Sequence, residues 1–269
     1  MTELGKRIRM NRILDPVTKT TIIIPMDHAV EGYFEQLEDP RKLIQSLVDA
    51  GVNGFLMRRG LAKFSSLQFA GRVGFIYRIT SATSLRNKVT DQSFVTTVEE
   101  AIRLGADAVA ATVFVGSEDE KEDLRMFGLI ADECDKWGIP LLGEMMPIGT
   151  KDAVPFDGPY SYEDVRIAVR VGCEEGADMI KTYYTGDPES FKKIVRYSTV
   201  PVTIAGGPKI RNVIDILKMV KEVMNSGAVG ICMGRKIWTY ENPPALVRAL
   251  LKIMVDKASV EEARIELST

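Results

Sequence analysis

Lys181 is the residue whose position in this sequence most clearly calls for a chemical explanation. It lies in the apolar run Asp178–Tyr184, which is typical of a buried strand, and a turn into a helix follows at Thr185–Pro188. A long amine is seldom buried unless it is ion-paired or reactive. Burial favours the uncharged amine, which attacks carbonyl carbons. Lys181 is therefore either a Schiff-base former or a structural partner of a carboxylate such as Asp27 or Glu144.

Two glycine turns after late apolar runs have the composition of a phosphate site. One turn comprises Ala205, Gly206 and Gly207, and the other comprises Gly234 and Arg235. Glycine lets the backbone approach a ligand closely, and a short helix opening after the second turn would point N–H groups at an anion. The alternative is that these glycines only make tight turns. A phosphate held here would place a short ketone near Lys181.

Proton transfer around such a lysine requires titratable groups, and the candidates are Asp27, Glu144 and Tyr183, with His28 beside Asp27 as a candidate to bind the substrate. Asp27 and His28 close the first strand, and Glu144 lies near the end of the fifth. Tyr183 shares a strand face with Lys181, because side chains alternate along a strand. A carboxylate such as Asp27 can move protons while a carbinolamine forms and loses water. The structural alternatives are a helix cap for Asp27, a turn residue for His28 and a packed aromatic for Tyr183.

Metal and triad chemistry find less support in the sequence. His28 is the only histidine, so a Ser-His-Asp triad or a histidine-rich zinc site would have to use it. The cysteines at 134, 173 and 232 show no metal-ligand spacing. We therefore expect no metal and no cofactor.

Further polar residues follow other strands. Arg58, in the sequence Arg58-Arg59-Gly60, is a candidate to bind a second anionic group, and a solvated basic turn is the alternative. Arg78 and Ser117 end the third and fourth strands.

Short apolar runs that alternate with amphipathic stretches predict the elements that carry these residues. The predicted strands are Thr21–Met26, Gly54–Met57, Val73–Ile79, Ala108–Phe114, Leu141–Met145, Asp178–Tyr184, Val202–Ala205 and Gly230–Met233. The predicted helices are Pro40–Ala50, Val95–Leu104, Glu118–Trp137, Tyr162–Glu175, Glu189–Arg196, Asn212–Asn225 and Pro244–Val255.

The joints between these elements indicate repeated units. Several helices run into Gly-Ala-Asp or a related sequence before the next strand, as at Gly105–Asp107 and Gly176–Asp178. The chain has 269 residues, which suits a single α/β (β/α)8 TIM barrel of roughly 250 residues. An open doubly wound sheet is the alternative, but its Gly-x-Gly-x-x-Gly sequence is missing after the first strand. We expect one domain, 1–269, with a lead-in over 1–20 and a helical extension over 257–269.

The composition of the chain restricts the classes of partner that it could bind. The chain has 35 basic and 37 acidic residues and a formal net charge of -2, which favours neither nucleic acid nor an anionic membrane as partner. The start, Met1–Arg7, has no apolar signal region, and no apolar run reaches the roughly 18 residues of a membrane span. With dispersed cysteines, these features predict a reduced, cytoplasmic protein.

Four segments together resemble the archaeal-type class I aldolases, the DhnA family. They are Met26-Asp27-His28, Lys181–Pro188, Ala205–Lys209 and Met233–Trp238, and the resemblance covers roughly Leu4 to Asp256. The family includes fructose-bisphosphate aldolases, aminodideoxyheptulosonate synthases and the phospho-autoinducer-2 thiolase. It implies that Lys181 forms the Schiff base, that Asp27 assists it, and that the phosphate is bound by Gly206, Gly207, Gly234 and Arg235. It also implies a homo-oligomer, a decamer.

Two departures concern the catalytic machinery. The aldolases carry Tyr-Pro-Arg-Gly after strand five, with the tyrosine as general acid and base, whereas this chain has Met146-Pro147-Ile148-Gly149. Met146 cannot transfer protons, so Glu144, Asp27 or Tyr183 would have to do so. Ala29 also replaces the family's glycine after Asp-His. The segment Gly149–Asp152 is closer to the thiolase branch.

These residues predict an enzyme that cleaves or forms a C–C bond in a phosphorylated keto-sugar through an imine on Lys181. One alternative is thiolase-type acyl transfer on a phosphorylated dione. A second is a phosphosugar-binding barrel without catalysis, which Met146 motivates. A third is an isomerase with Asp27 and Glu144 as acid and base.

Overall fold

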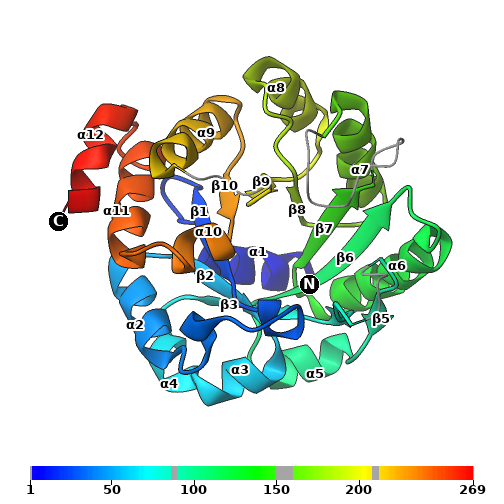
Figure 1. Cartoon of the computed structure of the whole chain (residues 1–269). Helices are drawn as coiled ribbons and strands as arrows, with labels where there is room; N and C mark the ends of the chain where they lie inside the picture. The colour runs from blue at the N-terminus through cyan, green and yellow to red at the C-terminus, as the bar shows by residue number, and fades with distance from the viewer. Residues whose placement is uncertain (1, 86–89, 149–159, 208–211, 269) are drawn as a thin grey trace.

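Eight parallel strands close into a barrel in the computed structural model, which describes residues 2–85, 90–148, 160–207 and 212–268. Neighbours around the barrel follow the order β1-β10-β9-β8-β7-β6-β3-β2, and β1 pairs with both β10 and β2 (Figure 1). The strands are β1 (Thr21–Pro25), β2 (Gly54–Met57), β3 (Gly74–Arg78), β6 (Ala108–Val115), β7 (Leu141–Pro147), β8 (Met179–Thr182), β9 (Val202–Ala205) and β10 (Gly230–Cys232). The predicted (β/α)8 barrel is confirmed, and each predicted strand is present.

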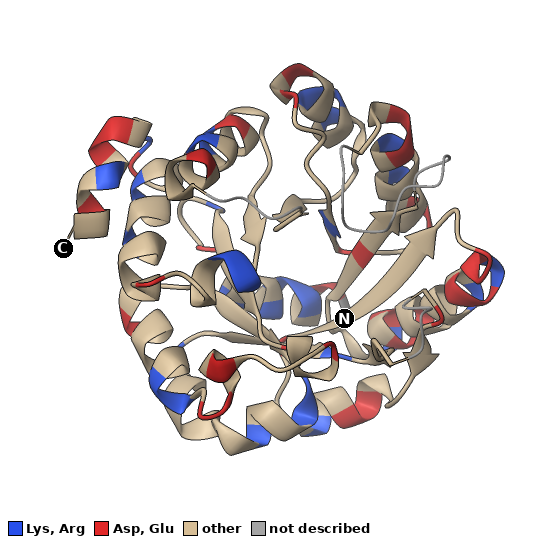
Figure 2. Cartoon of the chain, in the orientation of Figure 1, with Lys and Arg blue, Asp and Glu red and all other residues tan. Residues whose placement is uncertain are grey.

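Helices cover the outside of the barrel, as Figure 1 shows. The predicted ones are α2 (Arg41–Ala50), α5 (Val98–Arg103), α6 (Glu120–Trp137), α7 (Tyr162–Glu174), α8 (Pro188–Tyr197), α9 (Val213–Asn225) and α11 (Pro243–Met254). Shorter elements add to these: α3 (Arg59–Phe64), α4 (Ser66–Phe69), α10 (Arg235–Trp238), α12 (Val260–Arg264), the 3-10 turns η1 (His28–Val30), η2 (Glu35–Leu37) and η3 (Ile265–Ser268), and the hairpin of β4 (Thr80–Ser81) with β5 (Ser93–Phe94). Acidic and basic residues are interspersed along the surrounding helices (Figure 2).

The Gly-Ala-Asp joints have a physical role in the barrel. Asp107 donates its backbone N–H to the carbonyl of Phe75 and accepts the Phe75 N–H on its carboxylate, at 2.7 and 3.0 Å. Asp178 holds Leu141 in the same way, at 2.9 and 2.8 Å. Each acidic residue thus holds a residue at the start of the preceding neighbouring strand, Phe75 in β3 or Leu141 in β7, which aligns the strands at this end of the barrel.

The helix α1 (Thr2–Ile13), which the apolar pattern did not predict, closes that same end. Lys6 binds the Asp178 carboxylate at 2.8 and 2.9 Å, and Arg12 binds Asp107 at 2.9 Å. Ile13 and Leu14 pack against residues inside the barrel at this end, which include Ile23, Leu56, Ile76 and Met179. In Figure 1, α1 lies across the middle of the ring. The opposite end, at the carboxyl ends of the strands, is therefore the end that can open to a substrate.

Candidate active site

The register of three strands places chemical groups at one level inside the barrel. Thr112 on β6 pairs with Glu144 on β7, and Glu144 pairs with Lys181 on β8. All three side chains are buried. The predicted burial of Lys181 is therefore confirmed, and Glu144 is its direct neighbour because the strands pair in this register.

Four charged side chains form a chain of ion pairs across the barrel. Arg78 donates from Nε to Asp27 Oδ2 at 2.9 Å and pairs with Glu144 through Nη2. Glu144 in turn contacts Lys181 Nζ through Oε1. The exposed fractions of Arg78, Glu144 and Lys181 are 6%, 7% and 6%. The order Asp27, Arg78, Glu144, Lys181 alternates in sign, so the group is formally neutral.

The protonation state of Lys181 differs from the expectation of an uncharged amine. Burial by itself lowers the pKa of Lys181, but the carboxylate of Glu144 favours the ammonium, and the net pKa lies above its ordinary value of 10.5. Burial likewise raises the pKa of Glu144, yet Arg78 and Lys181 bring it well below its ordinary value of 4.5. Lys181 and Glu144 therefore rest as an ammonium and a carboxylate.

Asp27 lies at the other end of the ionic chain. Burial raises its pKa and the charge of Arg78 lowers it, with a net decrease from 3.8, so Asp27 is ionised. Its Oδ2 accepts from Arg78, whereas its Oδ1 lies 3.6 Å from His28 Nδ1. Its influence on Lys181 is a longer-range charge effect. The sequence predicts Asp27 within reach of Lys181. In the structure, Arg78 and Glu144 lie between them and link the two in the chain of ion pairs.

His28 lies beside the end of β10. Burial lowers its pKa to about 4, so the ring is neutral at pH 7. Its ring meets that of Trp238 edge-on at 5.9 Å, and Nδ1 has no hydrogen-bond partner among the described residues. A Cβ on Gly234 would come 3.0 Å from His28 Cε1 and 2.2 Å from the carbonyl oxygen of Pro25. The turn after β10 packs so closely against the end of β1 that position 234 requires glycine. This packing requirement holds whether or not Gly234 also binds a phosphate.

The two glycine turns lie next to each other because β9 and β10 are paired. Gly207 has φ of 62°, a backbone conformation that favours glycine. A Cβ on Gly206 would lie 3.5 Å from Lys236 Cε, an ordinary contact. Arg235 begins α10, and its half-exposed guanidinium lies 3.6 Å from Glu31 Oε2. Lys209 of the same motif lies outside the described residues.

Tyr183 belongs to an apolar wall above the ionic chain. This wall comprises Phe114, Met146, Tyr183 and Ala205, all buried. Tyr183 stacks on Tyr160 with ring centroids 3.7 Å apart, and burial raises its pKa well above 10.0. Tyr184 turns the other way and donates to Glu222 at 2.9 Å. The alternation of the two tyrosines is confirmed, and the Tyr183 hydroxyl stays protonated.

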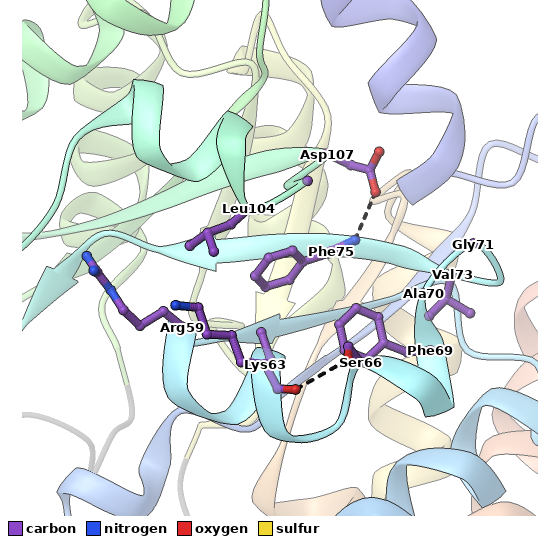
Figure 3. Close-up of a pocket in the computed structure, with 12 residues that line it drawn as sticks. Arg59, Lys63, Ser66, Phe69, Ala70, Gly71, Val73, Phe75, Leu104 and Asp107 are labelled. Atoms are coloured by element: carbon purple, nitrogen blue, oxygen red, sulfur yellow. Dashed lines mark hydrogen bonds between the residues drawn. The ribbon is translucent and has the colours of Figure 1, made fainter.

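The two arginines after β2 point in different directions. Arg58 donates to the carbonyl of Thr80 at 3.1 Å, and its buried Nε has no partner in the described chain. Arg59 instead donates to Tyr77 Oη at 2.9 Å and to Thr96 Oγ1 at 2.8 Å. It lines a separate cavity of about 350 Å³ on the outside of the barrel (Figure 3). The backbone between the two residues directs Arg58 towards Thr80 and Arg59 towards the outer cavity. Of the two, Arg58 therefore remains the candidate for a second anion.

Sequence reasoning missed the bridging role of Arg78. The residue ends β3 on the same face as Ile76, which lies inside the barrel, so alternation along the strand was the available signal. Thr112 was missed as well. It accepts from Arg78 Nη1 and donates to Glu144 Oε2 at 3.1 Å.

Within residues 2–85, 90–148, 160–207 and 212–268, no group of three or more His, Cys, Asp or Glu side chains is arranged to hold a metal ion. None of the helices in these ranges has the length and apolar character needed to cross a membrane.

Comparisons with known proteins agree with this geometry. The family model described as DeoC/LacD family aldolase matches residues 21–240. The chain is 35% identical over 259 residues to 2-amino-3,7-dideoxy-D-threo-hept-6-ulosonate synthase 1 of Archaeoglobus fulgidus, covering 96% of this chain and 94% of the relative. It is 29% identical to 2-amino-4,5-dihydroxy-6-oxo-7-(phosphonooxy)heptanoate synthase of Streptomyces griseus, covering 97% and 94%.

Solved structures give the same result. The fold matches that of an archaeal fructose 1,6-bisphosphate aldolase with a TM-score of 0.82 and 32% identity, over 92% of this chain and 98% of the other. A second such structure, at 31% identity, TM-score 0.82 and the same coverage, has its catalytic lysine covalently bound to the carbinolamine intermediate of its substrate. With the family model matching most of the barrel and the buried lysine in place on β8, this chain belongs to the DeoC/LacD aldolase family.

Proposed function

We propose that this protein is a class I aldolase or transaldolase-type enzyme that cleaves or forms a C–C bond in a phosphorylated keto-sugar. The observation that carries the proposal is the buried Lys181–Glu144 pair, on the strand next to β9 and its glycine turn. Lys181 acts as the nucleophile. Gly206, Gly207, Gly234 and Arg235 hold the phosphate, and His28, Arg58 and Ala205 line the substrate.

The resting ammonium is compatible with imine formation. A ketone and a lysine ammonium give a protonated imine and one water, so no proton is gained or lost overall. One ammonium proton must leave before the nitrogen attacks, and Glu144 Oε1, in contact with Nζ, is placed to accept it. The carbinolamine oxygen then leaves as water after it receives protons. Because the product imine is again a cation, the carboxylate of Glu144 stabilises both the start and the end of this step.

The C–C bond step needs a second acceptor. The protonated imine draws electrons from the bond between its α and β carbons, while a base removes the proton of the β-hydroxyl. The bond breaks, the β carbon leaves as an aldehyde, and the electron pair remains as an enamine on Lys181. Asp27 Oδ1 supports this role, because Asp27 is ionised and only its Oδ2 is bonded to Arg78. Tyr183 offers a protonated hydroxyl on the same strand face.

The names of the relatives narrow the substrate class. The compound named for the Streptomyces griseus synthase carries a 6-oxo group next to a 7-phosphonooxy group. A ketone one carbon away from a phosphate fits a lysine that lies one strand away from a phosphate-binding turn. We therefore propose a substrate with an α-phosphonooxy ketone and a charged far end, which binds Arg58 through the Nε that has no partner among the described residues.

Borohydride trapping tests the proposal. Incubation with dihydroxyacetone phosphate and borohydride should add one substrate-derived mass, and peptide mapping should place it on Lys181. Lys181→Met should give no adduct. Lys193→Met removes an exposed lysine from α8 and serves as the matched control, with full labelling expected. Absence of any adduct with dihydroxyacetone phosphate and fructose bisphosphate in the wild-type protein would reject the Schiff-base mechanism.

The alternatives predict other outcomes of the same assay. Thiolase-type acyl transfer would appear as turnover of a phosphorylated dione with coenzyme A as acceptor. A barrel without catalysis would bind a phosphosugar in calorimetry but give neither turnover nor adduct. An isomerase that uses Asp27 and Glu144 would keep its activity after borohydride treatment.

We also propose a single-domain homo-oligomer, a decamer by family resemblance, in the cytoplasm. The large apolar side chains of Phe94 and Leu129 are exposed beside a groove of about 340 Å³ between α5 and α6, which supports assembly. The three cysteines are free, as in a reducing compartment. Native mass spectrometry should give ten times the chain mass of 29.8 kDa, and a monomer would reject the oligomer.

A further inference from the structure

Arg78 occupies the centre of the candidate site, although neither the family resemblance nor the comparisons give it a role. Its guanidinium uses three nitrogen atoms for three different partners. Nε donates to Asp27, Nη1 to Thr112 and Nη2 to Glu144. A lysine has a single ammonium and could not span the two carboxylates, whereas the planar guanidinium presents donors on several sides.

We propose that Arg78 is a positioning residue: its guanidinium holds Asp27 and Glu144 as ionised carboxylates on either side of it and so balances the charge around Lys181. The proposal rests on the Schiff-base function of Lys181 given above. In this arrangement Arg78 acts through the carboxylates and does not touch the substrate. It keeps both carboxylates available as proton acceptors, one for Lys181 and one for the β-hydroxyl.

The charges around Lys181 determine how the loss of Arg78 would affect its amine. The groups with the largest effects on its amine are Glu144 from β7, Cys232 from β10, Arg78 from β3 and Asp27 from the turn after β1. Burial raises the pKa of Cys232 to about 12, so it is a neutral thiol at pH 7. The remaining three carry two negative charges and one positive charge around the ammonium. Without Arg78, two carboxylates would face one ammonium.

Loss of Arg78 should therefore hold the proton on Lys181 more tightly. The charge of Arg78 lowers the pKa of Lys181, and its removal raises that pKa further. Below its pKa, an amine reacts in proportion to its uncharged fraction, so each unit of increase slows the reaction roughly tenfold at constant pH. A merely structural role predicts the opposite, since a loosened site would return Lys181 towards its ordinary pKa and expose it.

The test is the rate at which Lys181 is modified by a small acylating reagent, acetic anhydride, at pH 9 in the absence of substrate. Peptide mass spectrometry reads Lys181, with Lys193 in the same sample as the exposed reference. Arg78→Met should react roughly tenfold or more slowly at Lys181. Arg12→Met removes an arginine that pairs with Asp107 at the closed end of the barrel, and it should keep the wild-type rate.

A charge-compensated variant separates charge from folding. Arg78→Met combined with Asp27→Asn removes one positive and one negative charge, and leaves Glu144 paired with Lys181. The modification rate of Lys181 should return towards the wild-type value. Arg78→Lys, which keeps one charge, should lie between the wild type and Arg78→Met.

An equal or faster rate in Arg78→Met, or no recovery in the double variant, would overturn the role of Arg78. These rates need no substrate, so they stand apart from the Schiff-base test. If wild-type protein gave no borohydride adduct, the proposed function would fail. If it gave the adduct but Arg78→Met reacted at the wild-type rate, only the positioning role would fail.

Discussion

Glu144 and Lys181 lie directly opposite each other on the paired strands β7 and β8 and form a buried ion pair. Both charges are buried, and each has additional charged neighbours in the barrel. This geometry fits both interpretations of Lys181. Glu144 can serve as a structural ion-pair partner of the ammonium, and it can also accept a proton when the amine reacts.

Glu144→Gln should separate imine chemistry from lysine basicity. The amide leaves the ammonium without a carboxylate in contact, so burial dominates and the pKa of Lys181 falls. Acetylation of Lys181 should become faster, whereas turnover should fall by roughly 10²- to 10⁴-fold through loss of the proton acceptor. Peptide mass spectrometry and steady-state kinetics measure the two effects, and turnover within twofold of wild type would argue against Glu144 as acceptor.

Met146→Tyr should increase cleavage of fructose bisphosphate. The resemblance to the aldolases places their general acid and base at this position, and Met146 lies in the apolar wall with Phe114, Tyr183 and Ala205. The added volume is expected to destabilise the protein by roughly 1–3 kcal/mol because the wall is buried. A coupled assay for triose phosphate gives the rate, and thermal unfolding gives the cost. Met146→Phe is the matched control, with the ring but without the hydroxyl.

Gly206→Ala and Gly234→Ala should differ in what they change. At Gly206 a Cβ makes an ordinary 3.5 Å contact, so the methyl group mainly blocks the phosphate, and KM should rise while Tm stays close to wild type. At Gly234 a Cβ would meet the Pro25 carbonyl oxygen at 2.2 Å, so Tm should fall sharply. An unchanged KM for Gly206→Ala would remove this turn from the phosphate site.

Asp123→Asn should stabilise the protein at alkaline pH. Burial raises the pKa of Asp123 from 3.8 to about 7. The folded state therefore binds this proton more tightly than the unfolded state, and the resulting stability is lost as pH rises through about 7. The Tm of Asp123→Asn should exceed the wild-type Tm at pH 8 and approach it near pH 4. Asp132→Asn, at an exposed position of the same helix, is the matched control, and its Tm should stay close to the wild-type Tm under both conditions.

Much of the fold follows from local sequence. Runs such as Gly54–Met57 and Val202–Ala205 coincide with strands because both faces of each strand are covered, which requires continuous apolar residues. The helix α1 was not predicted, because its sequence is largely polar and its role depends on Asp107 and Asp178, which are far away in the chain.

Arg58 and Arg59 illustrate a second limit on what can be predicted from the sequence. Their sequence is compatible with a shared basic turn, but the start of α3 at Arg59 turns one side chain towards Thr80 and the other towards Tyr77. A change of backbone direction between two adjacent residues cannot be read from their types.

The local sequence was enough to predict that Lys181 is buried near the carboxyl end of a strand, and that Asp27, Glu144 and two glycine turns also lie at strand ends. That information is local, since strand alternation and turn residues depend on near neighbours in the chain. Which of these charges pair with one another depends on how distant strands meet in the folded barrel. Closure of the barrel sets the register that joins Glu144 to Lys181 and brings Arg78 between Asp27 and Glu144. The resting charge of Lys181 depends on all of these, because electrostatic interactions act through space and not along the chain.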